Sequence, residues 1–418
     1  MKILHLCSSD LNGGAARAAY RLHKAQRKFG LDSHMLVIDK ASDDPFVHSL
    51  SRVRTARAIV ANALRKDIVK YQNTPNPTLH SLNVFPSGII KYINKIQPDV
   101  VNLHWLGGEM LSIAEIGKIK QPIVWTMHDM WAFCGAEHYE DPEHEGRYMS
   151  DYSAENRNAK HTGWDLDSWC YQRKKKHWSK QKFHVVTPST WLERCVKKSA
   201  LFSHQPIMTI SNCIDHSLYR PLDKDSARKF LGLPLDKKLV LFGAMSSTSD
   251  PRKGYHYLQQ ALLHLKVERN ADNIELVVFG ASGGSSAEDT GLITHYLGRL
   301  HDDFTLSALY NAADVFVAPS LQDNLSNTLV ESLACGTPCV AFDIGGMSDL
   351  IPSNDYGTLV PSIDKVALAV AIRTELARPR CSEKIAQRSM AMRSENHIAS
   401  QYSELYKCIL KQDYVTLT

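Results

Sequence analysis

The sequence predicts an α/β protein with two Rossmann-like domains, and three observations support this. The chain has 418 residues, which suits two domains of about 100 to 200 residues each. Short apolar runs rich in β-branched residues recur in both halves, separated by helical stretches, as buried parallel strands of βαβ units do. Many of these runs end at Gly, Pro or Ser, and ligands of open α/β sheets bind at such carboxyl ends.

The first half opens with a predicted strand over residues 3–7, followed by a loop and an alanine-rich helical pattern that Gly30 ends. Further strands are predicted over residues 34–38, 98–104 and 122–128. In the second half, strands are predicted over residues 238–243, 274–280, 314–320 and 338–342. We therefore expect an N-terminal domain over residues 1–212, a C-terminal domain over residues 213–394, and a final helix within residues 395–418.

Composition excludes several classes of protein. With 44% hydrophobic and 22% charged residues, the chain is neither disordered nor collagen-like. Its nine cysteines include no Cys-x-x-Cys pair, which argues against a zinc knuckle or a disulfide framework and suits a reducing cytoplasm. The N-terminus lacks a signal-peptide core, and no apolar run reaches the length of a membrane span, so we expect a cytoplasmic or surface-attached protein.

Charge is divided unevenly along the chain. Residues 1–200 carry a formal charge of +9 and residues 201–418 carry −4, which suggests that the first half faces an anionic partner. Residues 51–73 resemble a basic amphipathic helix, which either lies on an anionic membrane or packs on its own domain. Residues 137–182 are either a solvated loop and helix or an anion-binding insert. No nucleic-acid-binding motif is found, so nucleic acid is not expected as a partner.

Two segments can carry chemistry. Gly13 and Gly14 lie between the first strand and a helix, where they form either a plain tight turn or an anion site at the helix N-terminus. Residues 319–338 combine a strand end, Asp323 in a loop, and Glu331 about two turns inside a helix that ends at Gly-Thr-Pro. Either both acids face a ligand, or Asp323 caps the helix and Glu331 is a solvated surface acid.

The segment 319–338 resembles the signature of GT-B retaining glycosyltransferases of family 4: an acid, seven residues, a glutamate and a Gly-Thr-Pro helix end. Four further segments match that family in the same order, namely the Gly13-Gly14 loop, residues 125–131, residues 211–215 at the hinge position, and residues 251–254. The resemblance covers nearly the whole chain. It implies a GT-B fold, in which two Rossmann-like domains face across a cleft and a C-terminal helix crosses back to the N-terminal domain.

The resemblance also implies a nucleotide-diphosphate sugar as substrate and a role for each matching residue. Glu331 corresponds to the glutamate that holds the ribose, and Lys253 with Arg252 to the groups that hold the diphosphate. Asp323 and the amides of Asn324, Leu325 and Ser326 correspond to the contacts with the donor sugar. Gly13 and Gly14 would admit the diphosphate from the N-terminal domain, and His128 would lie near the anomeric centre. His104, at the end of the preceding predicted strand, is a second candidate for the acceptor side.

Two departures from the family pattern concern the donor site. Asp323 stands where the family commonly has the longer Glu, and Gly243-Ala244 stands where it often has Gly-Arg. We hypothesise that Arg252 supplies the missing guanidinium. Fixed cations stabilise charge that builds on a leaving diphosphate, so Arg252 and Lys253 could replace a divalent metal, and we predict neither cofactor nor metal. The Asp165-Leu166-Asp167 string is interpreted as incidental.

The leading hypothesis is a metal-independent retaining hexosyltransferase of bacterial surface polysaccharide synthesis, such as O-antigen, capsule or exopolysaccharide. Its acceptor would be polyprenyl-linked or an oligosaccharide, and the basic N-terminal half would touch the inner face of the membrane. One alternative is a sugar-nucleotide epimerase or disaccharide synthase on the same scaffold. Another is a non-catalytic nucleotide-sugar-binding subunit, which Asp323 and Ala244 would favour.

Overall fold

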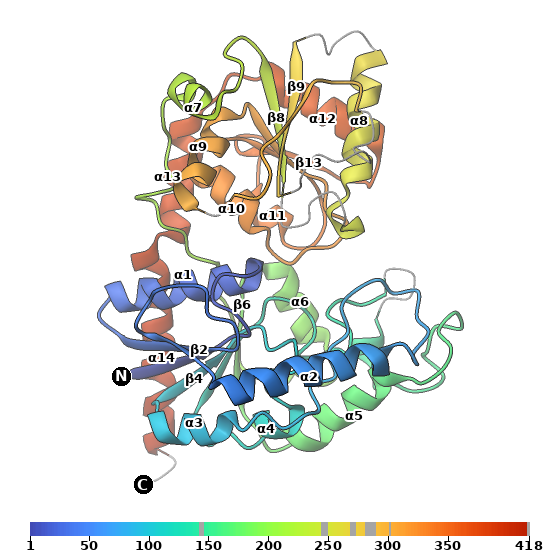
Figure 1. Cartoon of the computed structure of the whole chain (residues 1–418), viewed down its shortest axis with the longest axis vertical. Coiled ribbons are helices and arrows are strands. Elements are labelled where there is room, and N and C mark those ends of the chain that lie inside the picture. Colours follow the sequence, from blue (N-terminus) through green and yellow to red (C-terminus); the bar gives the residue numbers. More distant parts are fainter. Residues whose placement is uncertain (142–145, 244–249, 268–272, 281–289, 301, 416–418) are drawn as a thin grey trace. The chain divides into compact units, whose positions relative to one another are not determined.

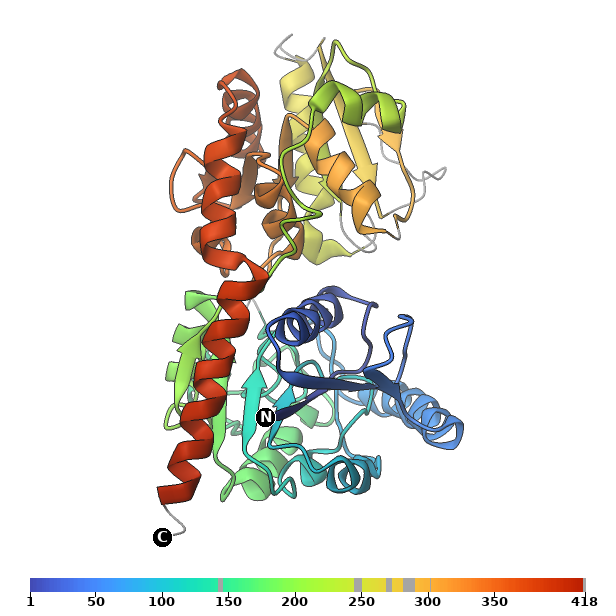
Figure 2. The same ribbon diagram turned by 90° about the vertical axis from the view of Figure 1, so that its left-hand side faces the viewer.

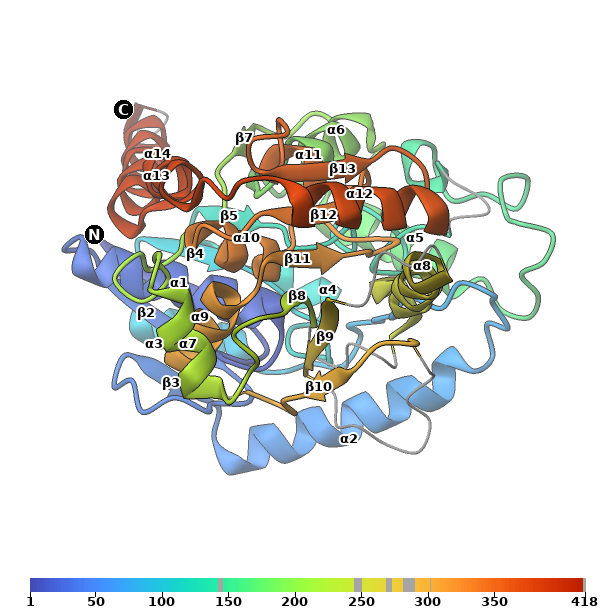
Figure 3. The same cartoon turned by 90° about the horizontal axis from the view of Figure 1, so that it is seen from above.

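The computed structural model describes residues 1–141, 146–243, 250–267, 273–280, 290–300 and 302–415 (Figure 1). The chain forms two compact units, one of Met1–Asn212 with Ile398–Thr418 and one of Cys213–His397. Each unit contains one parallel sheet with helices on its faces (Figures 1 and 3). The predicted α/β class with two Rossmann-like domains is therefore confirmed.

The N-terminal unit has a seven-stranded sheet in the order β3-β2-β1-β4-β5-β6-β7. All of its strand pairs are parallel. The strands are β1 (Lys2–Leu6), β2 (Asp32–Val37), β3 (Val47–Ser49), β4 (Val100–Leu103), β5 (Ile123–Thr126), β6 (Phe183–Thr187) and β7 (Ile207–Thr209). The strands predicted at 3–7, 34–38, 98–104 and 122–128 are β1, β2, β4 and β5.

The helices of this unit are α1 (Gly14–Lys28), α2 (Arg52–Val69), α3 (Ile89–Ile96), α4 (Ile113–Ile116), η1 (Arg147–Met149), α5 (Leu166–Trp178) and α6 (Thr190–Lys198). Two cores separate on the faces of the sheet, because successive side chains of a strand point to opposite sides. Cys7 and Met35 pack with Ala16 and Ala19 of α1, whereas Leu4 and the other inward residues of the opposite face join the larger core.

The C-terminal unit has a six-stranded sheet in the order β10-β9-β8-β11-β12-β13, again with only parallel pairs. The strands are β8 (Lys238–Gly243), β9 (Ile274–Phe279), β10 (Thr294–Tyr296), β11 (Val315–Ala318), β12 (Cys339–Phe342) and β13 (Gly357–Val360). The four predicted strands of this half are β8, β9, β11 and β12.

Its helices are α7 (Lys224–Leu231), η2 (Pro251–Lys253), α8 (Tyr255–Val267), α9 (Asp303–Ala312), α10 (Asn327–Ala334), α11 (Met347–Leu350), α12 (Lys365–Ala377) and α13 (Ser382–Arg393). Successive side chains of each strand again point to opposite faces of the sheet, so the core has two parts. Val240, Val315 and Val340 pack with α8 and α12 on one face, whereas Leu241 and Phe316 pack with α9 and α10 on the other.

The final helix α14 (Glu395–Val415) packs on the N-terminal unit (Figure 2). Its buried positions recur at helical spacing and form one stripe: Ile398, Tyr402, Tyr406 and Ile409. Tyr406 Oη accepts hydrogen bonds from Gln26 Nε2 at 3.0 Å and from Asn102 Nδ2 at 2.9 Å. The helix therefore supplies part of the buried polar interior of that unit, as the fold prediction requires.

The described part of the segment 137–182 contains a helix, α5, and a loop before it that is exposed at Ala154, Glu155, Ala159 and Lys160, as a solvated loop and helix would be. Buried side chains nevertheless anchor the helix in the N-terminal unit. Lys174 is fully buried on α5 and donates to the carbonyl oxygens of Trp131, Cys134 and Gly135. Burial lowers the pKa of Lys174 to about 8. Since its ammonium is already surrounded by carbonyl oxygens, Lys174 is not an exposed anion ligand.

Candidate active site

The loops at the carboxyl ends of β8, β11 and β12 are joined to one another. Lys253 Nζ donates to Asp323 Oδ2 at 2.9 Å, and the amide of Leu321 donates to the carbonyl of Arg252 at 2.7 Å. The amide of Gly346 donates to the carbonyl of Asn324 at 2.8 Å. These three contacts join the loops after β8 and β12 to the loop after β11. They hold the predicted donor-site residues of the β8 and β11 loops together, at the edge of the sheet where open α/β proteins bind ligands.

The close approach of these loops depends on Gly254. Its φ is +67°, and a Cβ at this position would overlap the carbonyl oxygen of Pro319. A side chain there would push the segment of Arg252 and Lys253 away from the loop that carries Asp323.

Arg252 pairs with Asp250. Its Nε and Nη2 donate to the two carboxylate oxygens at 3.1 and 2.8 Å. Burial raises the pKa of Asp250, but the contacts with Arg252 outweigh this and lower it below the usual value. The Arg252 side chain remains one-third exposed, so its guanidinium is oriented by Asp250 and still reaches solvent. Ala244, the departure that gave rise to the hypothesis for Arg252, lies outside the described residues.

Glu331 is buried in α10, with 4% of its surface exposed. Tyr310 Oη donates to Glu331 Oε2 at 2.8 Å, and burial, followed by the nearby Glu331 charge, raises the pKa of Tyr310 well above its usual value. Because α10 begins at Asn327, Glu331 lies in its second turn, nearer the N-terminus than the two turns predicted. The helix is capped by Ser326 and Glu331 is buried, so the explanation in which Asp323 caps the helix and Glu331 is a solvated surface acid is wrong.

The residues after Asp323 are also enclosed. Asn324, Leu325 and Ser326 are 2%, 7% and 6% exposed. Tyr310 was not predicted from the sequence, because its only local signal is an aromatic residue in an apolar helix.

In the N-terminal unit, Gly13 is the N-cap of α1 and Gly14 is its first residue. Gly13 has φ of +104°, and a Cβ there would meet no atom within 4 Å. The first turn of α1 contains no acidic side chain. Backbone conformation thus explains the glycine at position 13, and the open space leaves room for a ligand beside the helix N-terminus.

His128 follows β5 and belongs to a row of three histidines that lie on, or directly after, adjacent strands. Its Nε2 lies 3.1 Å from His104 Nδ1, and His104 Nε2 lies 2.9 Å from His5 Nδ1. Burial lowers the pKa of His128 and of His5 to about 4 and that of His104 well below its usual value. All three are therefore neutral imidazoles at pH 7. The sequence drew attention to His104 and His128 only, since His5 lies within an apolar strand.

A second polar group borders His128. Asp129 Oδ2 accepts from Trp105 Nε1 at 2.9 Å and lies 2.6 Å from His138 Nδ1. Burial raises the pKa of Asp129, but contact with His138 outweighs this and lowers it. The hollow lined by His104, His128, Asp129 and His138 measures only about 10 Å³ and is too small for a sugar.

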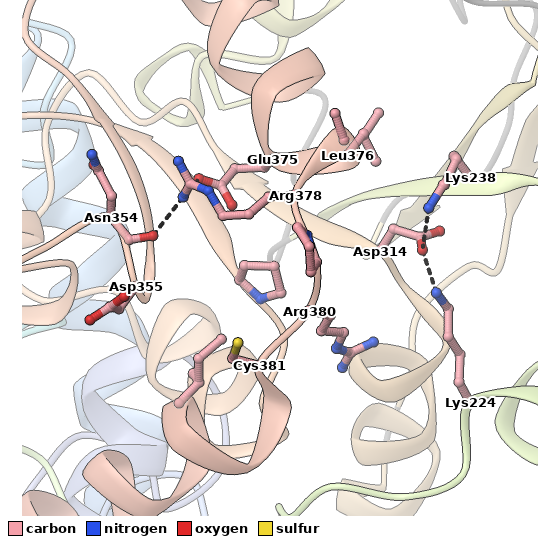
Figure 4. A pocket seen from close by; sticks show the side chains of 14 residues that line it. Lys224, Lys238, Asp314, Asn354, Asp355, Glu375, Leu376, Arg378, Arg380 and Cys381 are labelled. Carbon is pink, nitrogen blue, oxygen red and sulfur yellow. Dashed lines mark hydrogen bonds and ion pairs between the residues drawn. The ribbon is translucent and has the colours of Figure 1, made fainter.

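A larger hollow of about 460 Å³ lies at the opposite, amino edge of the C-terminal sheet (Figure 4). Lys238 begins β8 there and Asp314 precedes β11. Asp314 pairs with Lys224, Lys238 and Arg228, so its charge is compensated within the unit. We assign this hollow a structural role and use Lys224 below as a control position.

Helix α2 packs on its unit through only part of its apolar surface. Arg65 turns inward and donates to the carbonyl of His80, whereas Ile59, Val60 and Leu64 are 64%, 58% and 47% exposed. A groove of about 540 Å³ runs beside it, lined among others by Arg54, Arg57, Leu64, Phe85 and Met110. Packing on its own domain therefore does not account for the whole apolar stripe.

Within the part of the chain that the structure describes, no three His, Cys, Asp or Glu side chains are grouped as metal ligands. Asp165 caps α5 and pairs with Arg147, and Asp167 accepts from Gln72 Nε2 at 2.5 Å, so both acids of the Asp165-Leu166-Asp167 string have structural roles. All nine cysteines have free thiols. None of the described helices combines the length and the apolar character that crossing a bilayer requires.

Two family profiles match consecutive parts of the chain. The profile described as Glycosyltransferase Family 4 matches residues 12–218, and the profile described as Glycosyl transferases group 1 matches residues 236–378. The first match contains Gly13, Gly14 and His128, and the second contains Lys253, Asp323 and Glu331. The profiles therefore cover both of the loop systems described above.

Two curated relatives match part of the chain. It is 32% identical over 188 residues to D-inositol 3-phosphate glycosyltransferase 2 of Catenulispora acidiphila, covering 41% of this chain and 43% of the relative. It is 31% identical over 192 residues to phosphatidyl-myo-inositol mannosyltransferase of Mycobacterium leprae, covering 44% of this chain and 50% of the relative. The matches thus span half or less of the length of these relatives.

Solved structures match over almost the full length. Sucrose-phosphate synthase of Thermosynechococcus elongatus aligns with a TM-score of 0.67 at 18% identity, covering 99% of this chain and 100% of that one. The HepE protein of Anabaena, solved with UDP and glucose, aligns with a TM-score of 0.64 at 16% identity, covering 97% and 99%. At these identities the likeness establishes the GT-B fold and nothing more.

Proposed function

Because the chain carries a family 4 domain followed by a group 1 domain of glycosyltransferases, we propose that it transfers a sugar from a nucleotide-diphosphate sugar to a lipid-linked or oligosaccharide acceptor, with retention of configuration. The pathway we propose is the synthesis of a bacterial surface polysaccharide. The observation that carries the proposal is the contact between Lys253 and Asp323, which joins a cation for the diphosphate to an acid for the sugar.

The donor's parts are assigned as follows. Lys253 and Arg252 bind the diphosphate, and Glu331, held by Tyr310, binds the ribose hydroxyls. Asp323 and the amides of the segment 324–326 contact the sugar. Gly13 and Gly14 supply the N-terminal unit's contact with the anion.

The reaction breaks the bond between the anomeric carbon and the diphosphate oxygen, and the acceptor oxygen bonds to the same carbon on the same face. The leaving diphosphate takes the proton of the acceptor hydroxyl. Negative charge grows on the diphosphate as the bond breaks, and the fixed cations Lys253 and Arg252 stabilise it in the transition state more than in the ground state. We propose that they do so without a divalent metal, with His128 beside the sugar.

The exposed face of α2 supports a lipid-linked acceptor. It combines the apolar residues Ile59, Val60 and Leu64 with Arg57 and Lys66, both exposed, which suits an anionic membrane surface. We propose that the protein works in the cytoplasm, peripherally bound to the inner face of the membrane. The names of the two curated relatives favour a second acceptor class, inositol phosphates or phosphatidylinositol.

The test begins with thermal unfolding of the full chain in the presence of UDP, GDP and their sugars, because a ligand of the folded state raises the apparent stability. The nucleotide that binds is then supplied as its sugar with four acceptors in parallel: a polyprenyl-diphosphate sugar, phosphatidylinositol, inositol phosphate and a free hexose. Glycosylation of the first supports the proposal, transfer to an inositol acceptor supports the second class, and transfer to the free hexose indicates a disaccharide synthase.

Two further outcomes would contradict a transferase. Conversion of the nucleotide sugar to its isomer without an acceptor would indicate an epimerase. Donor binding by the wild type that is weakened in Glu331→Ala, without any turnover by the wild type, would indicate a non-catalytic binding subunit. The anomeric configuration of the product, determined by NMR, decides between retention and inversion, and activity in the presence of a chelator decides whether a metal is needed.

A further inference from the structure

A row of buried polar side chains leads from His128 to the C-terminal helix. His128, His104 and His5 come from three neighbouring regions of the sheet, since β5, β4 and β1 lie side by side. His5 Nε2 then lies 2.9 Å from Gln26 Oε1 on α1, and Gln26 Nε2 lies 3.0 Å from Tyr406 Oη on α14. Five side chains, from β1, α1, α14 and the loops after β4 and β5, thus form one continuous chain of hydrogen bonds.

The chain is enclosed. His5, Gln26 and Tyr406 are fully buried and His104 is 2% exposed, whereas His128 at its end is only partly buried. The ring centroids of His5 and His104 are 5.1 Å apart, and those of His104 and His128 are 5.4 Å apart. An apolar residue of similar size could fill a core position without the cost of desolvating an imidazole. Three histidines in contact within the core therefore require a reason beyond packing.

The direction of the hydrogen bonds follows from Gln26. Its amide oxygen can only accept, so His5 must carry its proton on Nε2. A neutral His5 then accepts at Nδ1 from His104 Nε2, and His104 accepts at Nδ1 from His128 Nε2. The same reasoning gives His128 a proton on Nε2 and a lone pair on Nδ1.

At the other end of the chain, Gln26 Nε2 donates to Tyr406 Oη, which also accepts from Asn102 Nδ2. The Oδ1 atom of Asn102 accepts in turn from Thr126 Oγ1 at 3.0 Å.

From this geometry we infer that His5 and His104 are positioning residues that fix His128 as the Nε2–H tautomer, with Gln26 setting the direction of the relay and Tyr406 contacting the Gln26 amide. In this tautomer Nε2 of His128 is the hydrogen-bond donor and Nδ1 is the acceptor. A role of His128 beside the sugar rests on the proposed function, whereas the tautomer itself does not. In an imidazole with one defined tautomer, one nitrogen always donates and the other always accepts. In a mixture of tautomers, either nitrogen can take either role.

The tautomers are measured on the full-length chain labelled with ¹⁵N-histidine, in two-bond ¹H–¹⁵N correlation spectra at pH 7 assigned through single histidine substitutions. The expected result is a neutral Nε2–H imidazole at His5, His104 and His128. Protons on Nδ1 of all three rings would mean that Gln26 is turned round, and a mixture of tautomers at His128 in the wild type would mean that no relay exists. Either result overturns the inference.

Three variants test the transmission. Gln26→Leu removes the acceptor for His5 and should convert His128, which is three hydrogen bonds away along the network, to a mixture of tautomers. Gln26→Glu keeps an acceptor oxygen and should restore the wild-type spectrum. Tyr406→Phe, a milder change that serves if Gln26→Leu does not fold, should give a partial mixture. An unchanged His128 spectrum in both folded variants would contradict the inference.

His34→Asn is the matched control, because His34 lies in the same sheet, on β2, and bonds to His48 and Asp32 outside the row. It should leave all three tautomers unchanged. In the transfer assay, Gln26→Leu should lower kcat about 10-fold with donor KM unchanged, as loss of a partner that orients a functional histidine does, and Gln26→Glu should restore it. Absence of any transfer activity together with the expected spectra would contradict the proposed function and leave the relay intact.

Discussion

Lys253 and Asp323 face each other across two loops of the C-terminal unit, with Nζ and Oδ2 at 2.9 Å. The two side chains are 26% and 16% exposed, so the pair is accessible while remaining partly shielded from water. A contact of this kind orients both groups before a ligand arrives, which reduces the reorganisation needed in the transition state.

Replacing Lys253 should therefore impair turnover more than folding. We expect Lys253→Ala to lower kcat on the order of 100-fold or more, because a fixed charge that stabilises the leaving group is lost. The measurement is steady-state transfer with the nucleotide sugar that the thermal-unfolding screen selects. Lys224→Ala, at the opposite edge of the same sheet, is the control and should keep wild-type kcat. Equal losses in both variants would show that Lys253 acts through stability alone.

The hypothesis for Arg252 has its own test. Arg252→Ala should weaken donor binding and turnover, because it removes the guanidinium that Asp250 orients and that would bind the diphosphate. Asp250→Asn keeps the guanidinium but loosens its orientation, so its effect should be smaller. Unchanged turnover and donor affinity in Arg252→Ala would refute the hypothesis.

The bond between Tyr310 and Glu331 should contribute to stability as well as to ligand binding. Tyr310→Phe removes a donor to a buried carboxylate, and we expect the free energy of unfolding to fall by about 1.5 to 3 kcal/mol. Urea unfolding at pH 7 measures this. Tyr296→Phe, a partly buried tyrosine in the same unit, should change stability by less than Tyr310→Phe. Similar stabilities for the two variants would contradict the assigned role.

The buried histidines predict a loss of stability in mild acid. Burial lowers the pKa of His23 in the folded chain from 6.5 to about 2, so between pH 6.5 and pH 2 the unfolded chain binds the extra proton and stability falls as pH falls. From pH 7 to pH 5, His23 should cost about 2 kcal/mol. His23→Gln should have a shallower dependence of unfolding free energy on pH, measured by urea titration at both values. Parallel curves for the wild type and the variant would contradict this.

The exposed face of α2 predicts membrane binding that depends on salt. Val60→Ser combined with Leu64→Ser should reduce flotation with vesicles containing anionic lipid, and so should raising the salt concentration, because both the apolar and the electrostatic contributions are weakened. The control is Phe230→Ser, an exposed apolar side chain of the C-terminal unit. Wild-type protein that stays unbound at low salt would contradict peripheral attachment.

Most strands of the two sheets, but only part of the candidate site, could be predicted from the sequence. Strands such as β8 and β9 were predictable because they are mainly apolar and almost every residue in them is buried. The three-residue strands β3, β7 and β10 were not, since each depends on pairing with a neighbour at the edge of its sheet. For such short strands, pairing with the neighbouring strand determines the structure, and the local sequence does not show that pairing.

The same distinction applies to the site. Lys253, Asp323 and Glu331 were found because each belongs to a compact motif. The partner of Glu331 is 21 residues away in the sequence, and the bond between Gln26 and Tyr406 joins residues 380 positions apart. Hydrogen bonds between such distant residues form only in the folded chain, so no local sequence pattern predicts them.

The position of α14 has a consequence for biosynthesis. Tyr402, Tyr406 and Ile409 fill the interior of the N-terminal unit, yet the ribosome makes them only after the whole C-terminal unit. Until then the surface that receives them remains open, and Gln26 and Asn102 lack the hydroxyl that they share. The first unit to be synthesised is therefore the last to be completed, and a stalled or shortened chain would present an unfinished unit to chaperones and proteases.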